Sequence, residues 1–388
     1  MLFNKNRKPS PDINEASNED NARPCKYDRI PIWCYVLIGF CVVCGIMYLV
    51  MCISQPFADF FNSTVGHASR FLLAKITSIL PFSLAEALIL LSPVILVLVI
   101  RYFVKKRCAT RKQTLVSVVC ILSVASAFLS CFVLTFAAGY RGYSLDKKLG
   151  LERNKVSAKE LYDSAVYLVE KIDGLDDGIT FGEDGFSVMP YDLNTLNEKL
   201  IQAYASYSSD HSFIQSYYSR LKPVLLSEAM SYAHITGVYT FFTGESNLNV
   251  NFPDYSIPHT AAHELAHQRG IAREDEANMI AFLVCLESDD EYVQYCAYLN
   301  MFEYVISALT KADRDLAREV WRMLPENVYR EELAYSSFFK KYQDSVTSQV
   351  SGAVNDAYLK GQGTEGQKSY GMVVDLTVAY LKSEGLIP

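Results

Sequence analysis

The stretch IWCYVLIGFCVVCGIMYLVMCI, residues 32–53, contains no charged side chain. A helix needs about 20 apolar residues to cross a bilayer, so this stretch has the length and composition of a membrane span. Residues 84–103, with Glu86 near one end, and the uncharged residues 114–138 qualify in the same way. A cleaved signal peptide is a poor alternative for the first stretch, which starts late and lacks a small-residue cleavage site. We therefore expect three transmembrane helices within residues 31–138.

Basic residues predict the orientation of these spans. Lys and Arg gather in the cytoplasmic segments that flank transmembrane helices. Such residues are frequent before the first span and between the second and third, whereas the segment between the first two holds only Arg70 and Lys75. The amino terminus is therefore expected in the cytoplasm, and residues 139–388 outside it. The two basic groups are Lys5, Arg7, Lys8, Arg23, Lys26 and Arg29, and Arg101, Lys105, Lys106, Arg107, Arg111 and Lys112.

The segments next to the spans allow coarser expectations. Residues 1–30 are polar and are expected to form a disordered cytoplasmic tail. Residues 55–81 carry spaced aromatic residues. This connection is expected either to lie on the membrane surface or to pack as a helical hairpin on the later domain.

Charge and cysteine content limit the function classes. The net charge is −7, and no basic stripe follows residue 150, so we expect no nucleic-acid partner. Eight of the ten cysteines lie between Cys25 and Cys131. Cys285 and Cys296 could form a disulfide if they lie on different helices, or they could remain two buried thiols. Cysteine usage therefore leaves the compartment open.

The later part of the chain, residues 139–388, has mainly helical periodicity. Helices are expected at residues 157–172, 192–207, 292–310, 313–323, 336–356 and 370–383. Residues 237–252 differ, because apolar and polar residues alternate there and a Gly-Glu pair interrupts them. This pattern predicts a strand or a hairpin. The expected fold is thus mainly α with a small β element.

His263, Glu264 and His267 form the pattern H-E-x-x-H. On a helix, residues four apart share a face, so both imidazoles can approach one metal ion. Glu264 projects beside that face, where a carboxylate can take a proton from water that Zn²⁺ has made more acidic. Pro258 suits a helix start and Gly270 a helix end. The pattern therefore predicts a zinc site with Glu264 as the catalytic base.

A catalytic zinc site needs a third protein ligand. The extended pattern H-E-x-x-H-x-x-G-x-x-H is excluded, because Arg273 stands where its last histidine would be. Glu274 and Glu276 open the next helix, and the turn at Gly270 could bring either of them back to the histidines. We favour Glu274 as the ligand and keep Glu276 as the alternative.

Four neighbouring polar residues have candidate roles. Asn278 shares a face with Glu274 and could orient a ligand. His259 could add a ligand, although a capping or substrate-facing role is favoured. Arg269 and Arg273 could bind a substrate carboxylate or a transition-state oxygen, although surface ion pairs are the commoner role of such residues. No other residue is singled out for substrate binding.

Residues 258–278, PHTAAHELAHQRGIAREDEAN, resemble an uncharacterised bacterial family of predicted zinc-dependent membrane proteins grouped with the gluzincin-type metallopeptidases. The resemblance extends through Tyr140-Arg-Gly-Tyr143 and residues 237–245, so it covers most of the chain. It implies a zincin-like metallopeptidase domain on a bacterial cytoplasmic membrane and names no substrate. A looser resemblance links Arg273-Glu-Asp-Glu-Ala-Asn278 to the Arg-Glu-x-x-Ala-Asp of membrane peptidases of the prenyl-protein and heat-shock type. It implies that Glu274 is the zinc ligand.

These features together predict a membrane-anchored zinc metallopeptidase that cleaves a peptide or protein substrate outside the cytoplasmic membrane. The strand around residues 248–252 could pair with an extended substrate. Two alternatives remain. One is a non-catalytic receptor or assembly protein stabilised by zinc, and the other is a sensor that signals through a partner.

Overall fold

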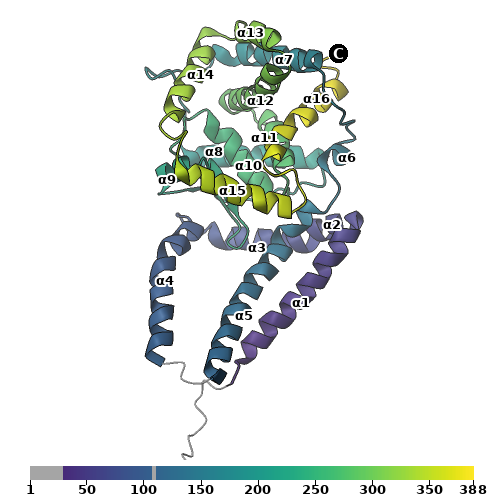
Figure 1. The fold of residues 1–388 in the computed structure, drawn as a ribbon. Coiled ribbons are helices and arrows are strands. Elements are labelled where there is room, and N and C mark those ends of the chain that lie inside the picture. The colour runs from purple at the N-terminus through teal and green to yellow at the C-terminus, as the bar shows by residue number, and fades with distance from the viewer. Residues whose placement is uncertain (1–28, 107–110) are drawn as a thin grey trace, which may run out of the picture.

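The computed structural model describes residues 29–106 and 111–388, so most of the expected cytoplasmic tail lies outside the described residues. Three helices long and apolar enough to cross a membrane lie below a helical domain (Figure 1). They are α1 (Ile32–Ile53), α4 (Leu84–Lys106) and α5 (Arg111–Thr135). The prediction of three such helices is confirmed.

The three apolar helices pack differently. α1 lies along α5, with Cys34 and Cys44 buried between neighbours. α4 stands apart, and its apolar side chains from Leu88 to Ile100 are exposed. Exposed apolar residues all round a helix suit lipid rather than water.

The amino end of α4 is fastened to the helical domain by buried carboxylates. Glu245 accepts hydrogen bonds from the backbone N–H groups of Leu84 (3.0 Å) and Ala85 (2.9 Å). These are orphan donors of the first turn, which a negative charge stabilises. In return, Glu86 accepts from the N–H groups of Leu225 (3.0 Å) and Leu226 (2.8 Å). These hydrogen bonds therefore hold the amino end of α4, the second span, against the helical domain.

The connection between the first two spans is itself helical. It consists of α2 (Gln55–Phe61), the π-helical turn η1 (Asn62–Gly66) and α3 (His67–Thr77). One face of α3 buries Arg70, Ala74 and Thr77, while Leu72 and Ile76 on the other face are exposed. The connection thus packs on the helical domain and still presents an apolar face outward.

Arg70 joins this connection to the helical domain. Its guanidinium is buried and donates to the carbonyls of Thr135 (2.8 Å), Asn62 (2.9 Å) and Arg269 (3.4 Å). Burial lowers the pKa of Arg70, and no carboxylate is among its partners in the described chain. Main-chain carbonyl oxygens, rather than a carboxylate, therefore stabilise the positive charge of Arg70.

Replacing Arg70 by Met is expected to lower the melting temperature of the purified full-length protein by several degrees. Each buried carbonyl left without its donor costs about 1–3 kcal/mol. Lys75→Met is the control, because Lys75 on the same helix is exposed and its substitution should change the melting temperature little. Equal shifts in the two variants would show that the buried hydrogen bonds of Arg70 do not stabilise the packing of α3 on the helical domain.

The helical domain follows the third span. After the 3₁₀ turn η2 (Ala137–Tyr140), its elements are α6 (Leu145–Leu149), α7 (Ala158–Asp176), α8 (Leu193–Asp210), β1 (Lys222–Pro223), α9 (Ser227–Tyr232), β2 (Gly237–Thr240), β3 (Glu245–Leu248), α10 (Ser256–Gln268), α11 (Glu274–Leu286), α12 (Glu291–Ala312), α13 (Arg314–Trp321), α14 (Glu326–Phe339), α15 (Val346–Gly361), the 3₁₀ turn η3 (Gly366–Met372) and α16 (Val373–Ser383).

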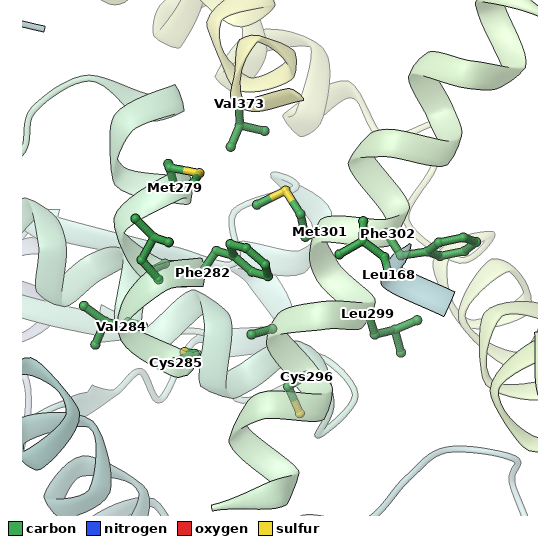
Figure 2. Packing of buried hydrophobic residues seen from close by; sticks show 14 of the residues in the cluster. Leu168, Met279, Phe282, Val284, Cys285, Cys296, Leu299, Met301, Phe302 and Val373 are labelled. Atoms are coloured by element: carbon green, nitrogen blue, oxygen red, sulfur yellow. The ribbon is translucent and has the colours of Figure 1, made fainter. Parts of the chain in front are cut away.

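The core of this domain lies where α11 and α12 pack on each other and on α7 and α16. Figure 2 shows Leu168, Phe282 and Met301 among its side chains. Cys285 of α11 and Cys296 of α12 also lie here as free, buried thiols, so the disulfide alternative is wrong. Burial raises the pKa of Cys285, which keeps that thiol protonated.

Local sequence signals explain where several helices begin. Ser157 and Glu160 form a capping box at the start of α7, and the carboxylate of Asp192 accepts from the N–H of Thr195 at the start of α8. One expected helix is wrong, because residues 336–356 are divided between α14 and α15. Ser345 starts the second of these by accepting from the N–H of Ser348 (2.9 Å), and such a side-chain cap favours a new helix start.

The small sheet has the strand order β1-β3-β2. β2 and β3 form the expected hairpin, with Tyr239 opposite Ser246. β3 ends at Leu248 and pairs with β1 on its other side, with Lys222 opposite Asn247. The expectation that residues 248–252 offer a free strand edge is therefore wrong, because β3 is the central strand and residues 249–252 lie outside it. β2 is an edge strand instead.

Candidate metal centre

The two histidines of the H-E-x-x-H pattern lie one turn apart on α10. Their rings are 4.5 Å apart between centroids and nearly perpendicular, with both side chains directed to the same side of the helix. The helix is buried along its length. It is also bound to the sheet, because the hydroxyl of Ser246 on β3 donates to the carbonyl of Glu264 (2.9 Å). The pattern therefore lies on a helix, as expected.

A tight turn brings α11 back to these histidines. The N–H of Ile271 donates to the carbonyl of Ala266 (3.1 Å) and that of Gly270 to His267 (3.0 Å), which is a Schellman ending. Gly270 has a φ of 95°, a conformation that side chains disfavour. α11 begins only four residues later, so its first residue, Glu274, meets the histidines.

Three ligand atoms converge as a result. Glu274 Oε2 lies 3.2 Å from His263 Nε2 and 3.4 Å from His267 Nε2, and each of the three residues is less than a tenth exposed. The atoms all lie within 4.8 Å of one another, so this buried group could bind a metal ion. The group lies between α10 and α11, which Figure 1 shows inside the helical domain, above α15.

The environment of His267 fits a metal. Its Nδ1 lies 2.7 Å from the carbonyl of Ile271, so the Nδ1 proton is donated there and Nε2 presents its lone pair. That lone pair faces the Glu274 carboxylate, which also offers only lone pairs. Two acceptors at this distance require a positive charge between them, either a proton or a metal ion. The residues present therefore fit a cation at this position.

The pKa values of Glu274 and His267 reflect the same arrangement. Burial would raise the pKa of Glu274, but His267 and His263 outweigh it and hold that pKa well below its ordinary value. Burial would lower the pKa of His267, yet Glu274 raises it to about 9. The group thus retains a proton in place of a metal ion up to mildly alkaline pH.

Glu264 lies beside these three residues but is not one of them. An added Cβ on Gly237 would lie only 2.6 Å from Glu264 Oε1, so the carboxylate needs a glycine at the start of β2. Burial raises the pKa of Glu264, with His263, His267 and the N–H of Tyr239 opposing the rise. Oε2 has no hydrogen-bond partner within the described residues. A buried carboxylate with a free oxygen and a raised pKa suits proton transfer.

Glu276 points away from the histidines. Its Oε1 accepts from the N–H of Leu145 (2.9 Å) and from Arg273 (3.1 Å). Burial raises the pKa of Glu276 to about 7, with Arg273 opposing. The geometry thus separates two residues that the sequence left as alternatives, and only Glu274 joins the histidines.

The other nearby candidates lie around the group. The amide of Asn278 donates to the hydroxyl of Tyr304 (3.3 Å) rather than to Glu274. His259 is buried one turn before His263, and its Nε2 has no partner in the described chain. Burial lowers the pKa of His259 to about 3, so its ring is neutral. His259 is not among the converging ligands.

The two arginines are engaged elsewhere. Arg269 lies over the ring of Tyr204 (4.1 Å to the centroid) and donates to the carbonyl of Tyr217 (3.1 Å). Arg273 binds Glu276 and donates to the carbonyl of Tyr140 (3.1 Å). Their contacts hold the α10–α11 turn in place, and neither joins the metal-ligand group.

Some residues next to the group carry no signal in the sequence. Phe136, just after the third span, packs its ring 5.6 Å from that of His267. Tyr358 on α15 binds the hydroxyl of Tyr140 and lies close enough to Glu274 for the carboxylate to contribute to raising the pKa of Tyr358. Both come from distant parts of the chain, and among 26 tyrosines no local pattern distinguishes this one.

Comparisons with known proteins give one match. Residues 63–378 match a family described as a protein of unknown function, DUF3810, which covers most of the chain. No curated protein and no solved structure matches. The matched stretch includes the candidate metal centre, the last two apolar helices and all of α3. The chain therefore belongs to the DUF3810 family.

Proposed function

We propose that this protein is a membrane-anchored zinc metallopeptidase that hydrolyses peptide bonds outside the cytoplasmic membrane. The observation that carries the proposal is the convergence of His263, His267 and Glu274 with Glu264 beside them. Two histidines and one carboxylate are a ligand set of catalytic zinc, which leaves a position open for substrate or water. A purely structural site would have no use for Glu264, a second carboxylate that is not a ligand.

Each residue then has a distinct role. His263, His267 and Glu274 would hold the zinc ion, which supplies Lewis acidity that polarises a carbonyl and makes water more acidic. Glu264 takes the proton from the attacking water and passes it to the leaving amine, for which its raised pKa is suited. The Ile271 carbonyl keeps His267 in the tautomer that presents Nε2.

β2 is the element best placed to bind the substrate. β3 pairs with one edge of β2, and Gly237, the first residue of β2, lies against Glu264. An edge strand offers unpaired backbone groups, with which an extended peptide can pair. A substrate bound there would pass directly by the catalytic carboxylate.

The orientation follows from the basic residues. Arg101 and Arg111 flank the connection between α4 and α5 at the end far from the helical domain. Because such residues remain in the cytoplasm, the domain and its centre are assigned to the opposite side. The amino terminus is assigned to the cytoplasm for the same reason.

Zinc content and hydrolysis of fluorescein-labelled casein by the full-length protein in lipid nanodiscs test this proposal. We expect about one zinc per chain, and cleavage that stops with a chelator and returns with added zinc. A correctly folded protein without zinc would overturn the metal assignment. Zinc without cleavage of casein or of a mixed peptide library would favour the non-catalytic alternative.

That alternative has one specific candidate for a closing ligand. The Nε2 atom of His259 is buried without a partner among the described residues, one turn before His263. The zinc content of the His259→Ala variant distinguishes the catalytic site from the closed, non-catalytic site. Retained zinc leaves three protein ligands and an open position, whereas lost zinc indicates a closed, structural site.

Zinc affinity is expected to rise with pH. The pKa of His267 is raised to about 9 in the metal-free group, so zinc must displace a proton below that pH. Each unit of pH lowered below about 9 should weaken binding by up to about tenfold. Competition with a chromogenic chelator at several pH values measures this slope. A pH-independent affinity would contradict the assigned ion pair of His267 and Glu274.

A further inference from the structure

The helix α15 has its apolar and polar faces reversed relative to a helix on a water-soluble domain. Apolar residues on such a helix normally face the core. On α15 the exposed face carries an apolar row of Val346, Val350, Ala353, Val354 and Ala357, which the exposed polar residues Thr347, Gln349 and Lys360 border. The half-buried face carries Ser348, Ser351, Asn355 and Asp356. The side of α15 that faces away from the protein is therefore the one that avoids water.

The carboxyl end of α15 is tied to the third span. The ring of Tyr358 lies 6.4 Å from that of Phe132, which is part of α5, and its hydroxyl binds that of Tyr140 just after α5. This end of the helix therefore lies at the level where α5 enters the helical domain.

The amino end of α15 is tied to the second span through α9. Ser345 donates to the carbonyl of Tyr232, and Lys341 pairs with Glu228 (2.5 Å). α9 begins directly after Leu226, whose N–H binds Glu86 in the first turn of α4. One end of α15 thus contacts the domain-side end of α5, and the other is linked through α9 to the domain-side end of α4. We infer that α15 runs roughly parallel to the membrane surface. Figure 1 shows it on the lower side of the domain, above α3.

Neighbouring segments present the same kind of surface. Leu225, next to α4, is 85% exposed, and Leu72 and Ile76 face outward from α3 while Arg70 faces inward. Single exposed apolar residues are ordinary, but here three separate segments carry them, and each segment contacts the domain-side end of α4 or α5.

We propose that α15 is an interfacial helix whose apolar row lies in the boundary between head groups and acyl chains of the bilayer leaflet on the domain side. The lipid surface is its partner, because the row continues the surface that the spans must already present to lipid. The interfacial position does not depend on what the metal-ligand group catalyses.

Tryptophan quenching by lipids brominated in the acyl chain tests this position. Val350→Trp and the control Leu333→Trp are each made in the full-length protein and placed in phosphatidylcholine vesicles. The two parent residues are similarly exposed, at 59% and 53%, but Leu333 lies on α14, away from the spans. The signal of the two native tryptophans is subtracted by using the unsubstituted protein.

We expect the added fluorescence of Val350→Trp to be quenched at least about threefold more by brominated lipid than that of Leu333→Trp. Aqueous acrylamide should show the reverse order. If acrylamide quenches both variants equally and brominated lipid neither, α15 faces water and the proposal is wrong. If Val350→Trp is protected from both quenchers, a second copy of the chain covers the row, which also overturns the lipid assignment.

Discussion

Glu264→Gln is expected to reduce peptide hydrolysis by about 10²–10⁴-fold while zinc content stays unchanged. Glutamine has nearly the same shape, so it keeps the close contact with Gly237. It cannot accept the proton of the attacking water, however, and the leaving amine then lacks its proton donor. Initial rates of casein cleavage and metal analysis of the same preparations provide the two measurements.

A matched control comes from a neighbouring buried carboxylate. Glu245 is also buried, but it caps α4 and does not touch the metal-ligand group. Glu245→Gln should therefore lower stability and leave the rate per folded molecule within a few-fold of the parent protein. Undiminished cleavage by Glu264→Gln would remove Glu264 as the base. Loss of zinc from this variant would instead mean that Glu264 helps to hold the metal.

Glu274→Gln should lose zinc, whereas Glu276→Gln should retain it. Glu274 contributes the only carboxylate among the three converging ligands, and an amide oxygen is a much weaker zinc ligand. Even outer hydrogen-bond partners of zinc ligands change affinity by about 10–100-fold, so loss of a direct ligand should exceed that range. Zinc dissociation constants for the two variants, measured with a chelator, provide the comparison.

The Glu276 variant also has an expected defect of its own. Glu276 accepts from the N–H of Leu145 and from Arg273, so its amide should weaken the contact between α6 and α11. A lower melting temperature with zinc retained is the predicted combination. If Glu276→Gln lost zinc and Glu274→Gln kept it, the assignment of the third ligand would be reversed.

Parts of the fold that depend on composition alone could be predicted from the sequence. The first span was expected at residues 32–53, and α1 has these bounds, because an uncharged run of this length leaves few alternatives. Local caps behaved similarly, as at Asp192 before α8. The hairpin of β2 and β3 also followed from alternation. Each of these signals acts between residues that are close in sequence.

What could not be predicted depends on how the chain returns on itself. The sequence placed Glu274 and Glu276 on different faces of one helix, but only the Schellman turn at Gly270 determines which face meets the histidines. The central position of β3 was missed because its second partner, β1, is only two residues long. Such a short strand leaves no periodicity from which it could be recognised.

The position of Arg70 has a consequence for how this protein can be processed. Arg70 and Asn62 precede the third span, yet they hydrogen-bond the turn at Arg269 and Gly270 that positions Glu274. A protease that shed residues 139–388 from the membrane would leave both partners behind, and the turn would lose its support. Shedding would therefore disturb the candidate metal centre rather than release it intact in a soluble domain.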